Sequence, residues 1–354
     1  MTIKQAHDFF LQIHVTSRCN LRCEHCYQDG TNSAEMTFEQ IVESVDEVAN
    51  TLDVWGDSYG IEFDRSSNVT GGEPFYRDDL MDILKHIKNR GFDIYLLTNG
   101  TQVDNSRAEE LSDVGIAGVQ VSIEGPEEVH DSIRGKGSYT EAMKGVIALL
   151  EAGHSVALNM TLSTLNAGYF MQMADIASNM GVHRFGFSRI VPYGSGEKLS
   201  QNMLTTREVR DLYEEISKLK FKNMRIVTGD PVASCLLFPE ATGAMGSVPL
   251  GGCSAGLSGI TFMPDGTILP CRRLDVPLGN ILIDSFREIW ATSPVLQDLR
   301  DKSLYSGKCG TCAMWASCRG CRAIAYANTL LAGEGDYLAD DPQCFHSFPE
   351  PSGD

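Results

Sequence analysis

Residues 16–27 read TSRCNLRCEHCY and place Cys19, Cys23 and Cys26 in the spacing C-x3-C-x2-C. Three thiolates on one short loop can ligate three irons of a [4Fe–4S] cluster and leave the fourth iron without a protein ligand. A structural zinc ion normally takes four ligands, and two nearby histidines are the only local substitutes for a fourth cysteine. The spacing therefore favours an iron–sulfur cluster with one open iron, which can bind a substrate or a cofactor.

Four further motifs follow this loop. They are VTGGEP at residues 69–74, LTNG at 97–100, QVSIEGP at 120–126 and HDSIRG at 130–135. Together with the apolar stretch before the first cysteine, the series resembles the radical S-adenosylmethionine (SAM) superfamily over roughly residues 8–345. The family usually has Asp where this chain has Glu124, so the resemblance assigns no role to that residue.

Composition is consistent with an enzyme of a reducing compartment. The chain has 354 residues and a formal net charge of −18, which argues against nucleic acid, where a basic surface is expected. No apolar run approaches the ~20 residues that span a bilayer, and the N-terminus has no signal-peptide pattern. Eleven cysteines in so long a chain indicate metal binding rather than disulfides. We therefore expect a cytoplasmic protein without nucleic-acid or membrane partners.

Strand and helix patterns alternate through the first part of the chain. Strands are predicted at residues 11–15, 61–69, 93–98, 118–123, 155–161 and 183–190. Helices are predicted at residues 37–52, 79–89, 106–114, 140–152, 169–179 and 205–219. Thr37, with Gln40 three residues later, is typical of a capping box. Repeated strand–helix units indicate an α/β fold with a parallel sheet and outer helices. The resemblance narrows this to a partial (β/α)6 barrel at residues 1–222, with the site at the carboxyl ends of its strands.

The resemblance also implies which residues contact SAM. The segment 71–74 would bind the amino group of SAM; its residues are Gly71, Gly72, Glu73 and Pro74. Ser122 and Arg134 match positions that would hold the SAM carboxylate, since Arg can bind a carboxylate with two donors. On the residues alone, Ser122 could simply point into the barrel and Arg134 could be a surface cation. Ser188 is a further candidate, and Tyr27 contacts adenine or belongs to the core. No catalytic acid or base is assigned.

A second group of cysteines occupies the C-terminal third. Its motifs are GCSAG at residues 252–256, PDGTILPC at 264–271, KCGTC at 308–312, SCRGC at 317–321 and DPQC at 341–344. They resemble a SPASM domain, which carries two auxiliary [4Fe–4S] clusters; we expect this domain at residues 253–354, after a linker region at 223–252. By resemblance, one cluster is held by Cys253, Cys271 and Cys321, and the other by Cys309, Cys312, Cys318 and Cys344. The interval from Cys318 to Cys321 is one residue shorter than the family pattern.

The first auxiliary cluster then lacks a fourth cysteine. Cys235 is the one cysteine left unassigned, and it either completes that cluster or is a buried apolar thiol. A third possibility is an open iron that binds substrate. Two zinc ribbons would also use seven cysteines, but the upstream loop favours iron–sulfur clusters.

The resemblance implies an enzyme that reductively cleaves SAM to a 5′-deoxyadenosyl radical, which abstracts hydrogen from a substrate. It also implies a low-potential electron donor of the ferredoxin or flavodoxin type. The first expectation for the substrate is a ribosomally made peptide that is crosslinked or oxidatively matured, with a separate leader-peptide-binding protein as one possible partner. The second is a tetrapyrrole of the haem pathway, modified by decarboxylation, and the third is formylglycine formation as in sulfatase maturases. A non-catalytic electron carrier is disfavoured, because ferredoxins use four cysteines per cluster.

Overall fold

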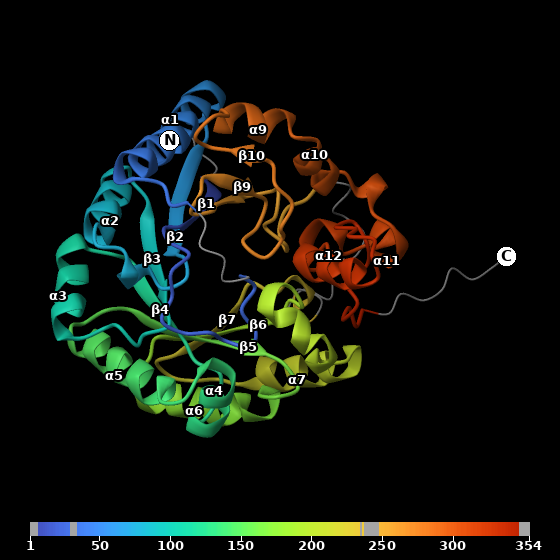
Figure 1. Ribbon diagram of the computed structural model, residues 1–354. Helices are drawn as coiled ribbons and strands as arrows, with labels where there is room; N and C mark the ends of the chain where they lie inside the picture. Colours follow the sequence, from blue (N-terminus) through green and yellow to red (C-terminus); the bar gives the residue numbers. More distant parts are fainter. Residues whose placement is uncertain (1–5, 29–33, 234–235, 237–247, 347–354) are drawn as a thin grey trace.

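The computed structural model describes residues 6–28, 34–233, 236 and 248–346 (Figure 1). Its strands form one sheet in the order β10-β9-β8-β1-β2-β3-β4-β5-β6-β7. From β1 to β7 all neighbours are parallel and follow chain order. These strands are β1 (Ala6–His14), β2 (Glu62–Thr70), β3 (Asp93–Thr98), β4 (Gly118–Ser122), β5 (Val156–Leu162), β6 (Arg184–Arg189) and β7 (Arg225–Thr228).

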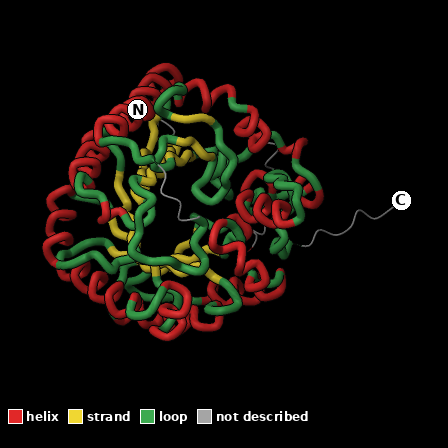
Figure 2. Tube along the Cα trace, in the orientation of Figure 1, coloured by secondary structure: helices red, strands yellow, loops and turns green. Residues whose placement is uncertain are grey.

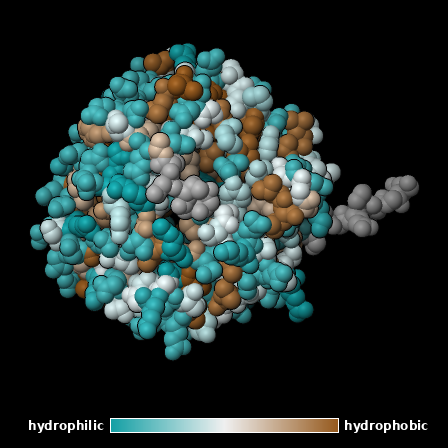
Figure 3. All heavy atoms as spheres, viewed as in Figure 1, coloured by the Kyte–Doolittle hydropathy of each residue, from teal (hydrophilic) through white to brown (hydrophobic). Residues whose placement is uncertain are grey.

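Helices surround the curved sheet on its outer side, and loops gather at its centre (Figures 1 and 2). The helices of the barrel are α1 (Phe38–Tyr59), α2 (Leu80–Asn89), α3 (Asn105–Val114), α4 (Glu127–Arg134), α5 (Ser138–Glu151), α6 (Phe170–Asn179) and α7 (Thr206–Lys218). Hydrophilic side chains cover much of this helical rim in the view of Figure 3. The arrangement is the partial barrel that the sequence predicts, with every βα unit placing its loop at the same end of the sheet.

The six predicted strands and six predicted helices are all present. The predicted capping box forms, because the Thr37 side chain accepts from the Gln40 amide and the Gln40 side chain accepts from the Thr37 amide. Helix α1 runs further than expected, to Tyr59, and Gly60 ends it in the left-handed conformation. Helix α4 was not expected. Strand β7 also differs from expectation, because it pairs with β6 inside the region treated as a linker.

Alternation along β1 separates a core face from a polar face. Phe9, Leu11 and Ile13 are buried in the apolar core between the sheet and its outer helices. Gln12 and His14 alternate with them and are also buried. A strand places successive side chains on opposite faces, so these two residues face the inside of the barrel. The interior is therefore polar at this point.

The C-terminal part continues the same sheet. Strand β8 (Gly259–Phe262) pairs with β1 in parallel, and it is followed by β9 (Thr267–Leu269) and β10 (Gly279–Asn280). Its helices are α9 (Phe286–Thr292), α10 (Pro294–Arg300), α11 (Gly307–Thr311) and α12 (Arg322–Leu331). In Figure 1 they lie between the two ends of the barrel sheet. No helix of the described residues has the length and apolar character needed to cross a membrane.

A buried ion-pair cluster joins the two parts. Arg189, the last residue of β6, donates to Asp230 at 2.6 and 2.9 Å and to Asp341 at 2.7 and 2.8 Å. Asp341 also accepts from the amide of Cys321 at 2.8 Å. All of these groups are buried. Because removing one partner of a buried pair leaves an uncompensated charge, this cluster holds the cysteine-rich region against the barrel.

Candidate active site

The cysteine loop, residues 17–28, leaves the end of β1 and lies directly against the end of β2. The amide of Gly72 donates to the carbonyl of Thr16 at 2.8 Å. A Cβ atom on Gly71 would overlap the carbonyl oxygen of Thr16, and one on Gly72 would overlap that of Arg18. Glycine is needed at both positions because two backbones touch there. The glycines therefore fix the cysteine loop, in addition to any contact with a ligand.

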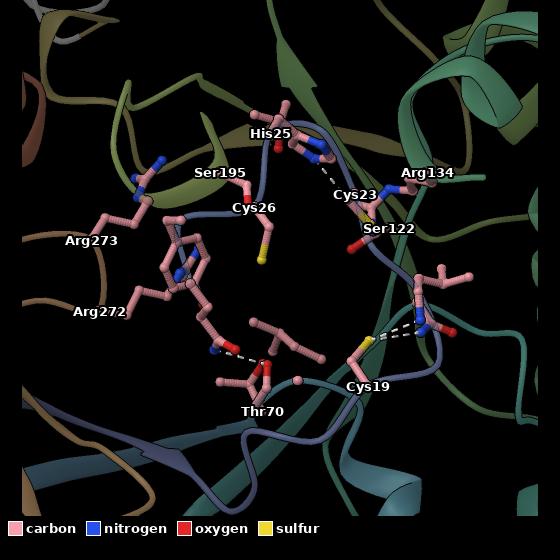
Figure 4. Close-up of a pocket in the computed structure, with 18 of the residues that line it drawn as sticks. Cys19, Cys23, His25, Cys26, Thr70, Ser122, Arg134, Ser195, Arg272 and Arg273 are labelled. Atoms are coloured by element: carbon pink, nitrogen blue, oxygen red, sulfur yellow. Dashed lines mark hydrogen bonds between the residues drawn. The ribbon is translucent and has the colours of Figure 1, made fainter. Parts of the chain in front are cut away.

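The three thiols of this loop point into one cavity (Figure 4). The amide of Leu21 lies 3.5 Å and the side-chain amide of Asn99 lies 3.8 Å from Sγ of Cys19. Nη1 of Arg134 lies 3.8 Å from Sγ of Cys23. Donors around a sulfur favour the thiolate that ligates iron. Burial raises the pKa of the Cys23 thiol to about 11, so ligation must displace a bound proton.

Glu124 is the centre of a charged group behind the loop. Its Oε1 accepts from Nη2 of Arg134 at 2.6 Å and from Nε at 3.0 Å, and lies 3.1 Å from Nε2 of His25. Its Oε2 accepts from the amide of Thr161 at 2.8 Å. Burial alone would raise the pKa of Glu124, but the charges of Arg134 and His25 outweigh it and lower the pKa to about 2. This carboxylate is therefore ionised and orients both neighbours.

The cavity has a volume of about 460 Å³. Strand ends supply much of its polar lining, which includes Thr70, Gln120, Ser122, Asn159, Thr161 and Ser188. Arg272 and Arg273, which follow β9, form the side of the cavity that faces Cys19 and Ser122 (Figure 4). The site thus lies between the carboxyl ends of the barrel strands and the C-terminal region.

The C-terminal cysteines gather in two groups. The pKa of Cys312 is raised to about 12, first by burial and then by three neighbouring thiols, those of Cys318, Cys309 and Cys344. Donors again lie near sulfur: the amide of Met314 is 3.3 Å from Sγ of Cys312, and that of Gly320 is 3.4 Å from Sγ of Cys318. The donor set and these contacts fit a second iron–sulfur cluster.

In the other predicted group, the charge of Cys253 acts on Cys321, and both Cys271 and Cys321 lie near Arg273. Burial raises the pKa of Cys321 to about 12, against the charge of Arg273, and the thiol of Cys253 adds to the rise. Among the described residues, no three His, Cys, Asp or Glu side chains converge on a site for a single metal ion. An iron–sulfur cube instead takes one thiol at each of several separate corners. Cys235, the suggested fourth ligand, lies outside the described residues.

Comparison with known families identifies two regions of the chain. The model of the radical SAM superfamily matches residues 13–177, and that of the iron–sulfur cluster-binding domain SPASM matches residues 253–322. An AdoMet-dependent heme synthase of Methanosarcina barkeri is 31% identical over 348 residues, which cover 94% of this chain and 95% of that protein. The chain belongs to the radical SAM superfamily.

Other relatives agree with this membership. The mycofactocin maturase MftC of Mycobacterium tuberculosis is 26% identical over 347 residues, which cover 96% of this chain and 83% of that protein. Among solved structures, Streptococcus suis SuiB bound to its precursor peptide SuiA matches with a TM-score of 0.71. The match covers 96% of this chain and 76% of SuiB at 18% identity. At so low an identity, the TM-score shows a common fold and nothing further.

Membership of the radical SAM superfamily fixes the class of cofactor. A radical SAM domain carries a [4Fe–4S] cluster and SAM, and a SPASM domain carries auxiliary iron–sulfur clusters. The chain is accordingly an enzyme of oxidoreductase-type radical chemistry, like the synthases and maturases that it resembles. Cys19, Cys23 and Cys26 share one loop and one cavity, and they remain the predicted ligands of the first cluster.

The predicted SAM contacts fall into two classes in the structure. Six of them line the cavity: Gly71, Gly72, Tyr27, Ser122, Arg134 and Ser188. Glu73 and Pro74 are buried and do not line it. Oε1 of Glu73 accepts from the Thr98 hydroxyl at 2.7 Å, and Oε2 accepts from the Asn99 amide at 2.8 Å. Glu73 thus ties β2 to β3. Contact with SAM remains a prediction for all eight residues.

Several residues of the site were missed by the sequence analysis. Glu124 was set aside because it departs from the family pattern, yet a carboxylate directly after the strand predicted at residues 118–123, ten residues before Arg134, was a signal in the sequence. His25 was considered only as a metal ligand. Arg272 and Arg273 were not considered, because nothing in the sequence shows that β8 pairs with β1 and brings them to the barrel.

Proposed function

We propose that this radical SAM enzyme abstracts hydrogen from a carboxylate-bearing substrate, and that a tetrapyrrole of the haem series is the first candidate. The observation that carries the proposal is the charge of the cavity lining. Among the described residues that line the cavity, five side chains are cationic and one, Glu24, is acidic, in a chain whose net charge is −18. The cations are Arg22, Arg134, Lys198, Arg272 and Arg273. A cavity of opposite sign to the whole protein concentrates anions.

Sequence similarity supports the tetrapyrrole. The heme synthase of M. barkeri matches nearly end to end, and the pre-heme d1 synthase of Dinoroseobacter shibae is 28% identical over 94% of this chain. Tetrapyrrole precursors carry several carboxylate side chains, which suit a cationic cavity. This order reverses the sequence-based expectation, which placed a peptide first. The expected reaction is oxidative decarboxylation of a side chain: the side chain would give up one hydrogen atom to the 5′-deoxyadenosyl radical, carbon dioxide would leave as a carbon–carbon double bond forms, and the one remaining electron would pass to an iron–sulfur cluster.

Peptide maturation is the second candidate. The similarity to mycofactocin maturases, over 96% of this chain, favours it. A peptide would bring a C-terminal or side-chain carboxylate to the same cations. The external electron donor and a separate leader-binding protein remain predictions. Formylglycine formation has no specific observation in its favour.

The residues of the chain supply position and environment. When bound, the cluster and SAM supply a 5′-deoxyadenosyl radical. Glu124 holds Arg134 beside Cys23, and the contact of Gly72 with Thr16 fixes the loop that carries the thiols. The strand ends line the cavity, where they would hold the substrate carbon near the radical and limit the access of water.

The test is anaerobic. The enzyme is loaded with iron and sulfide, supplied with SAM and dithionite, and incubated with either a propionate-bearing porphyrin or a candidate peptide. We expect the porphyrin to increase 5′-deoxyadenosine formation and to yield a product that has lost carbon dioxide, both detected by mass spectrometry. Stimulation by the peptide alone would overturn the tetrapyrrole assignment and establish the second candidate. Absence of 5′-deoxyadenosine with a fully loaded cluster and either substrate would overturn both.

A further inference from the structure

Resting on the proposed function, we infer that Arg272 and Arg273 form a binding site for a substrate carboxylate on the cavity wall that faces the cysteine loop. Both side chains lie in the cavity, on the side opposite Cys19 and Ser122 (Figure 4). They follow strand β9, in a turn closed by a bridge between Cys271 and Leu274. Two neighbouring guanidinium groups present a fork of donors that suits a carboxylate.

Each guanidinium has few partners within the protein. Nη1 of Arg272 donates to Oε1 of Gln12 at 2.9 Å, and Nη1 of Arg273 donates to the carbonyl of Arg189 at 3.3 Å. Nε of Arg273 is buried and has no hydrogen-bond partner. Within the described part of the chain, neither arginine forms an ion pair with a carboxylate. A guanidinium offers five N–H donors, so most of them remain for a ligand.

Other interior arginines have carboxylate, carbonyl or aromatic partners, although Nε of Arg319 and Nε of Arg322 also lack a hydrogen-bond partner. Arg134 pairs with Glu124, and Arg189 pairs with two aspartates. Arg322 donates to the carbonyls of Tyr337 and Ala339, and its guanidinium lies 5.0 Å from the ring centre of Tyr305. The pair at 272 and 273 differs in that two adjacent like charges share a cavity, and among the described residues no carboxylate lies within ion-pair distance of either. Asp230, which acts on Arg273 from further away, is already paired with Arg189.

Buried polar groups hold Arg272 in place. Gln12 accepts from Arg272 through its side-chain oxygen. Its side-chain nitrogen lies 3.1 Å from Nε2 of His14. Nδ1 of His14 lies 2.9 Å from Nε2 of Gln28, which donates to the carbonyl of Gly71 at 3.2 Å. Burial and the charge of Arg272 lower the pKa of His14 to about 3, so His14 is neutral. The chain of contacts orients Arg272 without supplying a negative charge, and it links the arginine to the glycine segment that fixes the cysteine loop.

Charge compensation is the competing explanation. Arg273 also lies near the thiols of Cys271 and Cys321, whose thiolates would be negative in an auxiliary cluster. Compensation requires only a positive charge close to sulfur. Carboxylate binding requires the planar fork of donors, which Lys lacks. The double variant R272K/R273K keeps the charge and loses the fork, so it separates the two roles.

Binding to the iron-loaded enzyme tests the site directly. The probe is coproporphyrin III, which carries four propionates, and its neutral tetra-amide is the comparison compound; both are followed anaerobically by porphyrin fluorescence. The variants are R272Q/R273Q and R272K/R273K. The control R207Q/R210Q removes two exposed positive charges from α7, away from the cavity. Iron content and the electron paramagnetic resonance spectra of the clusters are measured on every sample.

We expect the affinity of R272Q/R273Q for the acid, coproporphyrin III, to be at least about tenfold lower than that of the wild-type enzyme. The affinity of R272K/R273K should fall by a smaller factor. The tetra-amide should bind all forms equally weakly, and the control should match the wild type. If the Lys variant keeps its clusters and binds the acid like the wild type, the carboxylate site is wrong. If the Gln variant keeps its clusters and its affinity for the acid, the site is equally wrong.

A failure of the proposed substrate gives a different result. In that case the wild-type enzyme binds neither porphyrin, and the same comparison is made with a substrate peptide as the free C-terminal acid and as the amide. Tighter binding of the acid, lost in R272Q/R273Q, would support the carboxylate site while the tetrapyrrole is rejected. Equal binding of the acid and the amide would overturn the site.

Discussion

Glu73 and Glu124 lie just beyond the ends of β2 and β4, and both are fully buried, but the pKa values of their carboxyl groups are shifted in opposite directions. Burial raises the pKa of Glu73 to about 7, and hydrogen bonds from Asn99, Thr98 and Phe75 offset only part of that rise. At Glu124 the charges of Arg134 and His25 outweigh burial, and the pKa is about 2.

The difference shows that the partner, rather than burial, decides the charge of a carboxyl group in this barrel. Neutral donors stabilise a carboxylate modestly, whereas an arginine at 2.6 Å keeps it ionised. The end of β4, here called the β4 corner, therefore carries the fixed ion pair of Glu124 and Arg134 beside Cys23. The end of β2, the β2 corner, carries Glu73, which titrates, next to Gly71 and Gly72. Both corners act on the cysteine loop, but by different means.

The largest effect should come from the backbone contact at the β2 corner. In the variant G72A the new Cβ would overlap the carbonyl of Arg18, so the cysteine loop must shift. We expect loss of the first cluster and of 5′-deoxyadenosine formation, while the auxiliary clusters remain. Electron paramagnetic resonance and product analysis measure both. The control is G168A, because nothing lies within 4 Å of a Cβ at Gly168. Full activity of G72A would show that the loop tolerates displacement.

Removing the charge at the β4 corner should have the next largest effect. E124Q leaves Arg134 buried without its counter-ion, and breaking a buried pair costs about 3–5 kcal/mol. We expect a lower urea midpoint of unfolding at pH 7. The control E128Q changes an exposed glutamate of α4, the helix that carries Arg134, and its midpoint should equal that of the wild type. An unchanged midpoint for E124Q would mean that the pair adds no net stability.

The two corners should also differ in how stability depends on pH. The pKa of folded Glu73, about 7, lies above its ordinary value of 4.5, so between these values the native state keeps a proton that the unfolded state releases. Its contribution to stability therefore falls as pH rises from 4.5 to 7, by up to about 3 kcal/mol. Glu124 contributes in the opposite sense: its stabilisation is present above pH 4.5 and is lost as pH falls towards 2.

The variant E73Q cannot titrate, so its unfolding free energy should lose the decline between pH 4.5 and 7 that the wild-type protein shows. Urea unfolding across this range measures the slope. A wild-type slope that persists in E73Q would assign the titration to another group.

The sequence predicted the fold far better than it predicted the walls of the cavity. Periodicity and caps are local, so six strands, six helices and the Thr37 capping box could be read directly. The pairing of β8 with β1 is not local, since more than 240 residues separate Phe10 from its partner Gly259. Arg272 and Arg273 reach the cavity only through that pairing. The direction of a pKa shift likewise depends on a non-local contact: Glu124 is in direct contact with the charged Arg134, whereas the hydrogen-bond donors of Glu73 are neutral and Arg107 acts on it only from a distance.

The smallest effect concerns the hydroxyl of Thr98 at the β2 corner. In T98V a methyl group of similar size replaces this hydroxyl, which donates to Oε1 of Glu73 at 2.7 Å and accepts from the amide of Gly100 at 3.0 Å. Loss of the Gly100 contact lowers stability by the same amount at every pH, so only the contact with Glu73 changes the pH profile. Loss of this donor destabilises the carboxylate by about 1 kcal/mol and so raises the pKa of Glu73 by about one unit. The fall in stability with pH should then continue above pH 7, whereas in the wild-type protein it levels off there. T140V, at an exposed position on α5, is the matched control. If the T98V profile overlaps that of the wild type, the hydrogen bond does not set the charge of Glu73, and burial alone governs this corner.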